Sequence, residues 1–153
     1  MKIVYLHGLH SSPMSYKRKV LEDMGHIVCA PYLRADDWNA SLCHARSIIT
    51  RVKPDVVVGS SRGGAVALAV QPDCRVLLIA PAYAKYYPEA KLSPQTHILH
   101  SANDEVIPYS DSVKLARSCK ERLHQVGSSH RMNDEEAITT LIKLLPIDLL
   151  EKG

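Results

Sequence analysis

The 153-residue sequence has no long hydrophobic run and no large cluster of one charge. Because no stretch approaches the roughly 18 consecutive apolar residues that cross a bilayer, we expect no membrane-spanning helix and no membrane partner. The longest basic run is Lys17-Arg18-Lys19, and the formal net charge is only +3. Such a weak basic signal does not indicate a nucleic-acid partner, and we expect the triplet to be a solvated helix face.

Cysteine is scarce and shows no C-x-x-C spacing and no histidine pair at zinc-finger distances. The four cysteines are Cys29, Cys43, Cys74 and Cys119. We therefore expect them to be buried as small hydrophobic residues rather than joined in disulfides or bound to a metal. The first apolar stretch meets His7 and Gly8 too early to be the core of a signal peptide, which favours a reducing, cytoplasmic location.

Short apolar runs alternate with segments of helical pattern along the chain. Strands are expected at 2–6, 26–30, 55–58, 75–80, 96–100 and 122–126. Helices are expected at 13–24, 38–52, 65–70, 110–120 and from 133 to just before Pro146, with an irregular stretch at 81–94. This alternation predicts one α/β domain over residues 1–153, a doubly wound parallel sheet with helices on both faces.

The stretch from Pro54 to Gln71 contains the most informative motif. Between a β-branched run and a helix-forming segment lies Gly59-Ser60-Ser61-Arg62-Gly63, which fits G-x-S-x-G with Ser61 at its centre. The pentapeptide is weak by itself, but a strand followed by a sharp turn into a helix is the setting that the motif requires. There, Ser61 takes a strained backbone conformation, and its Oγ is exposed at the carboxyl end of the sheet.

Two further loops offer partners for this serine. In a parallel sheet the reactive groups gather beyond the carboxyl ends of the strands, where Asp104 follows the fifth predicted strand and His130 the sixth. We interpret Ser61 as the nucleophile, His130 as its base and Asp104 as the acid that orients His130. Asp111 and Glu105 compete for the acid role, but Asp111 is better explained as a helix cap and Glu105 as a solvated acid.

The backbone N–H groups of Leu9 and Arg62 are expected to form an oxyanion hole, since one follows the first strand and the other follows the nucleophile. The Arg62 side chain is unusual, because a cation in the first turn of a helix opposes the helix dipole. It predicts a negatively charged partner, either a nearby Asp or Glu or an acidic group of the substrate.

Several residues near these loops have two interpretations. Four residues are expected to line the substrate pocket: His7, Tyr83, Tyr86 and Tyr87. For the three tyrosines, ordinary packing is nearly as good an explanation. His7 is better explained as positioning the first loop. His7 and His10 have no carboxylate beside them, so no metal is expected. His100 is either a neighbour of the reactive groups or a buried structural histidine.

Four loops resemble a known family. Residues 5–13, Tyr-Leu-His-Gly-Leu-His-Ser-Ser-Pro, resemble the H-G-x-x-S-S-P opening of the small YqiA-like (UPF0227-type) esterases of the α/β-hydrolase superfamily. Gly59 to Gly64 resembles their G-S-S-x-G-G elbow, and the loops at Asp104 and His130 are similar to their acid and base loops. Two features depart from the family: Arg62 stands where an apolar residue is more usual, and the stretch 81–94 is short for a cap.

The resemblance implies a minimal α/β-hydrolase fold with six strands in the order 2-1-3-4-5-6 and no large cap domain. It also implies cleavage of small acyl esters through an acyl-serine intermediate, without a cofactor. A thioesterase or deacylase with the same residues, or a non-catalytic binding protein of the same fold, remains an alternative. A nucleotide-binding fold is disfavoured, because no G-x-G-x-x-G or Walker-type loop follows the first strand. The oligomeric state is left open.

Overall fold

The computed structural model describes residues 1–145, and their six strands form one parallel sheet in the order β2-β1-β3-β4-β5-β6. The strands are β1 (Lys2–Leu6), β2 (Ile27–Cys29), β3 (Val56–Ser60), β4 (Arg75–Ile79), β5 (Thr96–His100) and β6 (Leu123–Gln125). The strand order and the parallel direction confirm the predicted architecture. All strands therefore end at the same edge of the sheet, where the predicted reactive loops begin.

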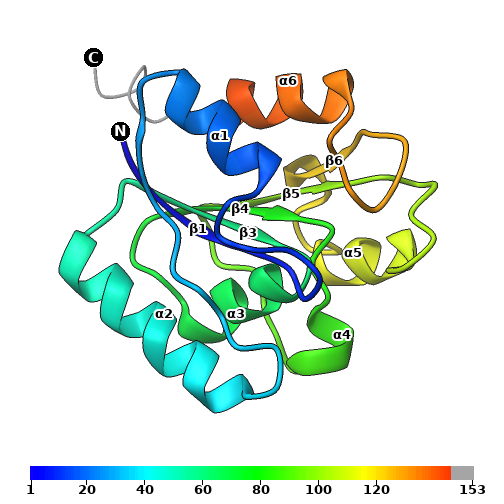
Figure 1. The fold of residues 1–153 in the computed structure, drawn as a ribbon. Helices are drawn as coiled ribbons and strands as arrows, with labels where there is room; N and C mark the ends of the chain where they lie inside the picture. Colours follow the sequence, from blue (N-terminus) through cyan, green and yellow to red (C-terminus); the bar gives the residue numbers. More distant parts are fainter. Residues whose placement is uncertain (146–153) are drawn as a thin grey trace.

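Helices cover both faces of the sheet (Figure 1). The helices are α1 (Tyr16–Asp23), α2 (Trp38–Val52), α3 (Arg62–Val70), α4 (Tyr83–Tyr86), α5 (Tyr109–Leu115) and α6 (Glu135–Leu144), with a 3₁₀ turn at Lys120–Arg122. Figure 1 shows α1 and α6 on one face and α2 and α3 on the other. Within residues 1–145, no cap domain stands over the sheet, as the family resemblance implies.

Each central strand supplies two hydrophobic cores, one on each face. In β1, Ile3 and Tyr5 join the core under α1 and α6, whereas Val4 and Leu6 join the core under α2 and α3. Both faces of such strands are buried, so they appear in the sequence as continuous apolar runs rather than as alternating patterns.

Side chains at the helix starts explain where the helices begin. Ser15, Asp37 and Asp134 each accept a hydrogen bond from a backbone N–H in the first turn of α1, α2 or α6. The sequence predicts that helix α1 begins at Pro13, but with Ser15 as its cap the helix begins at Tyr16.

Other boundaries also differ from the prediction or lie outside the described residues. Strand β3 ends at Ser60 rather than at residue 58, and helix α3 begins at Arg62 rather than at residue 65. Helix α5 spans Tyr109–Leu115 and does not continue to residue 120, because turns at Ala116 and Cys119 lead into the 3₁₀ segment. The stretch 81–94, expected to be irregular, includes the short helix α4. The predicted end of the last helix at Pro146 lies outside the described residues.

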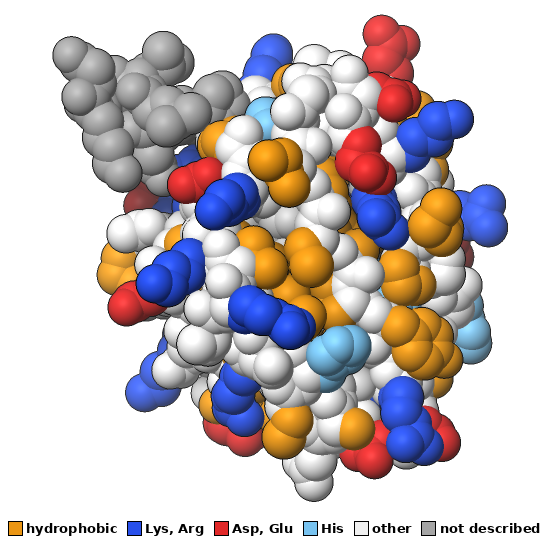
Figure 2. Space-filling view, turned by 60° about the vertical axis from the view of Figure 1, so that its left-hand side comes forward, with side chains coloured by type: hydrophobic (Ala, Val, Ile, Leu, Met, Phe, Trp, Pro, Cys, Tyr) orange, Lys and Arg blue, Asp and Glu red, His pale blue; other side chains and the backbone are white. Residues whose placement is uncertain are grey.

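The structure also bears on the predictions about membrane-spanning helices, surface charge and the cysteines. No helix within residues 1–145 is long and apolar enough to cross a membrane. Figure 2 shows Lys and Arg side chains spread singly over one face, with Asp and Glu among them. The four cysteines are free, but their predicted burial holds fully for Cys119 only, since Cys43 is exposed on α2 and Cys29 and Cys74 are half-buried.

Candidate active site

Ser61 lies in a sharp turn between β3 and α3. Its φ of 56° and ψ of −115° place it outside the backbone regions that non-glycine residues favour, at a cost of about 1–3 kcal/mol. The turn is held by a hydrogen bond from the Ser61 N–H to the Ile79 carbonyl at 2.9 Å. Gly63 is required beside it, because a Cβ there would overlap the carbonyl oxygen of Leu6. The strained elbow predicted from the motif is therefore present.

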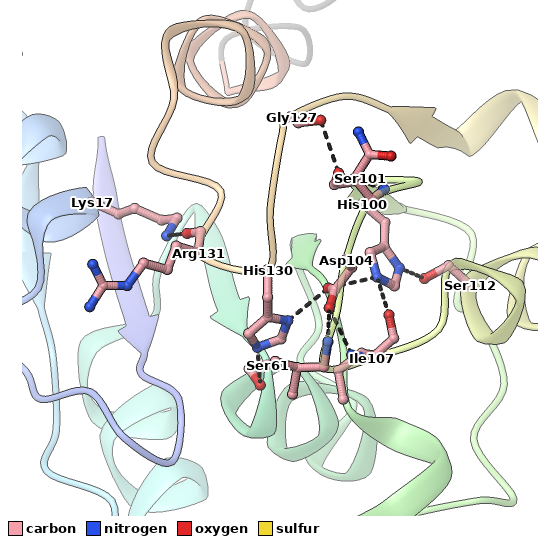
Figure 3. A network of polar contacts seen from close by, with 12 residues as sticks. Lys17, Ser61, His100, Ser101, Asp104, Ile107, Ser112, Gly127, His130 and Arg131 are labelled. Carbon is pink, nitrogen blue, oxygen red and sulfur yellow. Dashed lines mark hydrogen bonds and ion pairs between the residues drawn. The ribbon is translucent and has the colours of Figure 1, made fainter.

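The structure brings Ser61, His130 and Asp104 into one hydrogen-bonded row (Figure 3). His130 Nε2 lies 3.1 Å from Ser61 Oγ, and His130 Nδ1 lies 2.7 Å from Asp104 Oδ2. Because a carboxylate only accepts hydrogen bonds, Nδ1 carries the imidazole proton and Nε2 is left to accept from the serine hydroxyl. This is the tautomer that a general base for Ser61 needs.

The side chain of Asp104 is fully buried and has four hydrogen-bond donors around its carboxylate. Oδ1 accepts from the backbone N–H groups of Val106 and Ile107 at 2.8 and 2.7 Å, and Oδ2 accepts from His130 and His100. Burial by itself would raise the pKa of Asp104, but the hydrogen bonds from Ile107, His130 and Val106 outweigh it and lower the pKa. The carboxylate is therefore ionised and fixed in direction at neutral pH.

His100 is a neighbour of the reactive groups and not only a structural residue. It is 0% exposed, its Nε2 lies 3.0 Å from Asp104 Oδ2, and its Nδ1 lies 2.7 Å from Ser112 Oγ. Burial lowers the pKa of His100, so the ring is neutral and donates from Nε2 to Asp104 while Nδ1 accepts from the Ser112 hydroxyl. The sequence left both interpretations of His100 open and gave no signal for Ser112.

The loop that carries His130 is anchored on both sides of the histidine. Ser101 Oγ donates to the Gly127 carbonyl at 2.9 Å, and Lys17 Nζ donates to the Arg131 carbonyl at 2.5 Å and to Asn133 Oδ1 at 2.8 Å. Lys17 is 6% exposed, so the prediction of a solvated face is wrong for this residue. Its spacing of four from the buried Leu21 is the signal that places both on the inner side of α1.

A cleft of about 540 Å³ opens at Ser61 and His130. Leu9 and Arg62 line it, and among the described residues neither backbone N–H has a hydrogen-bond acceptor. Gly8 lies against Ser61, because a Cβ on Gly8 would lie 3.3 Å from the Cβ of Ser61. The two N–H groups predicted for an oxyanion hole are therefore free and border the cleft.

The Arg62 side chain has a different environment from the one predicted. It is 2% exposed, and its Nη2 donates to the Arg34 carbonyl at 2.9 Å and to Ser41 Oγ at 3.1 Å. The guanidinium also lies 5.6 and 5.4 Å from the ring centres of Trp38 and Tyr86. In the described part of the chain no carboxylate forms an ion pair with it. Neutral oxygens and aromatic faces thus compensate the buried charge, in place of a nearby acid or an acidic substrate.

Of the four predicted pocket residues, only Tyr86 lines the cleft. His7 is buried, with Nδ1 donating to the Gly8 carbonyl at 2.8 Å and Nε2 accepting from the Leu33 N–H at 2.9 Å. It ties the first loop to the segment before α2, in agreement with its positioning role. The Tyr83 hydroxyl donates to the Asp111 carbonyl at 2.6 Å, and Tyr87 packs against the core. Tyr83 and Tyr87 therefore pack within the fold, in agreement with the alternative interpretation that the sequence left open.

The arrangement has the parts that nucleophilic catalysis by a serine requires: a base within reach, an acid that orients the base, and free N–H donors beside the nucleophile. Within residues 1–145, no group of three or more His, Cys, Asp or Glu side chains is placed to hold a metal ion. The roles of Ser61, His130 and Asp104 in turnover stay predictions at this point.

Solved structures share this fold over most of their length. A protein from Xanthomonas campestris described as a candidate hydrolase of the alpha/beta superfamily matches with a TM-score of 0.76 and 24% identity, covering 99% of both chains. A thermophilic esterase from the Planctomycetes species Thermogutta terrifontis, with butyrate bound, matches at 0.68 and 16% identity, over 99% of this chain and 83% of the esterase.

A second Xanthomonas campestris protein, a serine hydrolase without a lid, matches with a TM-score of 0.64 and 14% identity, over 93% of this chain and 78% of its own. At these identities the likeness shows the α/β-hydrolase fold. No curated protein matches the sequence. Residues 2–94, more than half of the chain, match the sequence profile of one family. With its α/β-hydrolase fold, the chain therefore belongs to the uncharacterised protein family UPF0227.

Proposed function

We propose that the protein is a serine hydrolase that cleaves small acyl esters through an acyl-serine intermediate. The row from Ser61 through His130 to Asp104, with contacts of 3.1 and 2.7 Å at the mouth of an open cleft, is the observation that supports this function best. The esterase and hydrolase neighbours of the fold agree with it.

The reaction follows from the roles of these groups. His130 Nε2 takes the hydroxyl proton of Ser61 as Oγ attacks the ester carbonyl, and Asp104 stabilises the imidazolium that forms. The N–H groups of Leu9 and Arg62 hold the negative oxygen of the tetrahedral intermediate, and each such donor contributes about 3–4 kcal/mol. His130 then passes its proton to the departing alcohol. Water, activated by the same imidazole, releases the acid and regenerates Ser61.

The reactive groups are rigidly supported, which is what a low barrier requires. Asp104 is saturated with donors, His130 lies on a loop anchored by Lys17 and Ser101, and Ser61 is held in its turn by the bond to Ile79. The acid, the base and the nucleophile therefore need little rearrangement to reach the transition state.

A fluorophosphonate tests the activation of Ser61 directly, because the reagent phosphonylates only serines with an oriented base. We expect intact-mass measurement to show one adduct on the wild type and none on Ser61→Ala. Ser11→Ala, which changes an exposed serine of the same cleft, should still be labelled. Absence of an adduct on folded wild type would refute the proposal.

The partners of Ser61 are tested by the rate of labelling. His130→Ala and Asp104→Asn should each slow the reaction by about 10³-fold or more, as removal of one member of such a triad does. Ester hydrolysis, followed as acid release, should fall in parallel. A labelling rate unchanged in either variant would contradict the roles given to these residues.

A further inference from the structure

The charged side chains that line the catalytic cleft are all basic. Beside Ser61 and His130 the lining includes Lys17, Lys85 and Arg131, and no Asp or Glu of the described chain lines it. Lys85 lies on α4, whereas Lys17 and Arg131 lie on the other wall, next to His130. Figure 3 shows Lys17 and Arg131 on the side of His130 away from Asp104. A substrate at Ser61 therefore meets basic side chains and no carboxylate in the described lining of the cleft.

None of these cations is neutralised by an ion pair within residues 1–145. The Arg131 guanidinium is exposed and has no hydrogen-bond acceptor there, and Lys85 Nζ contacts only the face of the Tyr86 ring, at 5.4 Å. Two surface arginines outside the lining of the cleft do form ion pairs, Arg18 with Glu22 at 3.0 Å and Arg34 with Asp36 at 3.1 Å. Among the described residues, cations without an ion pair also occur away from the cleft, Arg46 among them, so these three cations are distinguished by lining the cleft together.

Lys17 is the most unusual of the three because its charge is almost fully buried. Burial first, and then repulsion by Arg131, lower the pKa of Lys17 to about 8, and the attraction of Asp134 offsets only part of this. Two of its three N–H donors bind the neutral oxygens of Arg131 and Asn133, which leaves one donor for a ligand. An anion in the cleft would relieve the repulsion between Lys17 and Arg131.

We propose that the cleft selects esters that carry a free carboxylate, which Arg131 and Lys17 bind beside the reacting ester group. The inference rests on the proposed esterase function and names its substrate class. Arg131 offers the planar fork that matches a carboxylate, and Lys17 adds its remaining donor. Lys85, on the opposite wall, adds to the positive potential that draws the anion in. The Arg62 guanidinium takes no part, because it is buried against Arg34 and Ser41.

Binding to the inactive Ser61→Ala variant tests this selectivity without turnover. The two probes are monomethyl adipate and methyl hexanoate, which share a six-carbon acyl chain and differ in the terminal carboxylate. Calorimetric titration should show that monomethyl adipate binds about fivefold or more tightly than methyl hexanoate. Adding Arg131→Gln should weaken binding of the charged ester by about fivefold and that of the neutral ester by clearly less.

Arg46→Gln in the same background is the matched control, since it removes one exposed positive charge outside the cleft. It should leave the preference for the charged ester in place. Equal affinity for the two probes, equal losses with Arg131→Gln, or an equal effect of Arg46→Gln would overturn the inference.

Turnover of both esters by the wild type separates the two proposals. Binding preference without any turnover would refute the esterase function and support the carboxylate site. Turnover of both esters without preference would support the esterase and refute the carboxylate site.

Discussion

His100 offers the sharpest test of how the site is built. Replacing it in His100→Phe keeps a ring of similar size but removes the donor to Asp104 Oδ2, which lies 3.0 Å away, and the acceptor for Ser112 Oγ. A hydrogen bond to a charged group contributes about 1.5–3 kcal/mol, and buried groups left without partners add a similar penalty. The fold should therefore lose about 2–4 kcal/mol of stability, measured by urea unfolding.

Activity should change in a way that lost stability alone does not explain. With three donors in place of four, Asp104 is less firmly oriented toward His130, and kcat should fall by about 10- to 100-fold, which corresponds to the same 1.5–3 kcal/mol. Without the hydrogen bond from His100, the negative charge of Asp104 stabilises the protonated form of His130 more strongly. The acid limb of the pH–rate profile of kcat/KM should therefore move to higher pH.

Two variants serve as controls for this prediction. Ser112→Ala removes only the contact to Nδ1 and should give a smaller loss in the same direction. His124→Phe removes a half-buried histidine of β6 that has no contact with Asp104, and the pH–rate profile should keep its wild-type shape. A kcat within twofold of the wild type in His100→Phe, with an unshifted profile, would show that His100 does not position the acid.

Two further predictions concern stability. Burial lowers the pKa of His7 and of His100, so the unfolded chain takes up protons first as the pH drops below about 6.5. The free energy of unfolding should thus decrease from pH 7.5 to 5.5 in urea titrations, and a constant value would contradict the burial of neutral histidines. In Gly63→Ala, the new Cβ overlaps the Leu6 carbonyl, which is backbone and cannot move aside. We expect a loss of about 3 kcal/mol or more, or no soluble protein, whereas a wild-type urea midpoint would show that the elbow tolerates a side chain there.

The features predicted correctly from sequence depend on local patterns. The apolar runs predicted the central strands β1, β3 and β4, because a strand buried on both faces needs apolar residues at consecutive positions. One topological rule predicts that three distant side chains lie close together, because parallel strands end at the same edge of the sheet. These side chains are Ser61, Asp104 and His130. The glycines around Ser61 predicted its strained turn, which is a property of a few adjacent residues.

The tertiary structure decided what depends on the direction and burial of long side chains. The sequence does not say that Arg62 turns toward Arg34 and Ser41, or that Lys17 points inward to the loop of His130. Both are cations, for which solvent exposure is the ordinary expectation, and their oxygen partners are remote in sequence.

The environment of the site was likewise decided by contacts between distant segments. His100 contacts Asp104 and Ser112 because α5 packs beside β5. The walls of the cleft carry positive charge because α1, α4 and the His130 loop each contribute a basic residue to its lining. The sequence by itself thus determined the fold and which three side chains, Ser61, His130 and Asp104, lie together at one edge of the sheet. Only the folded chain determined which charges surround them, because that depends on packing between elements and not on pattern within one.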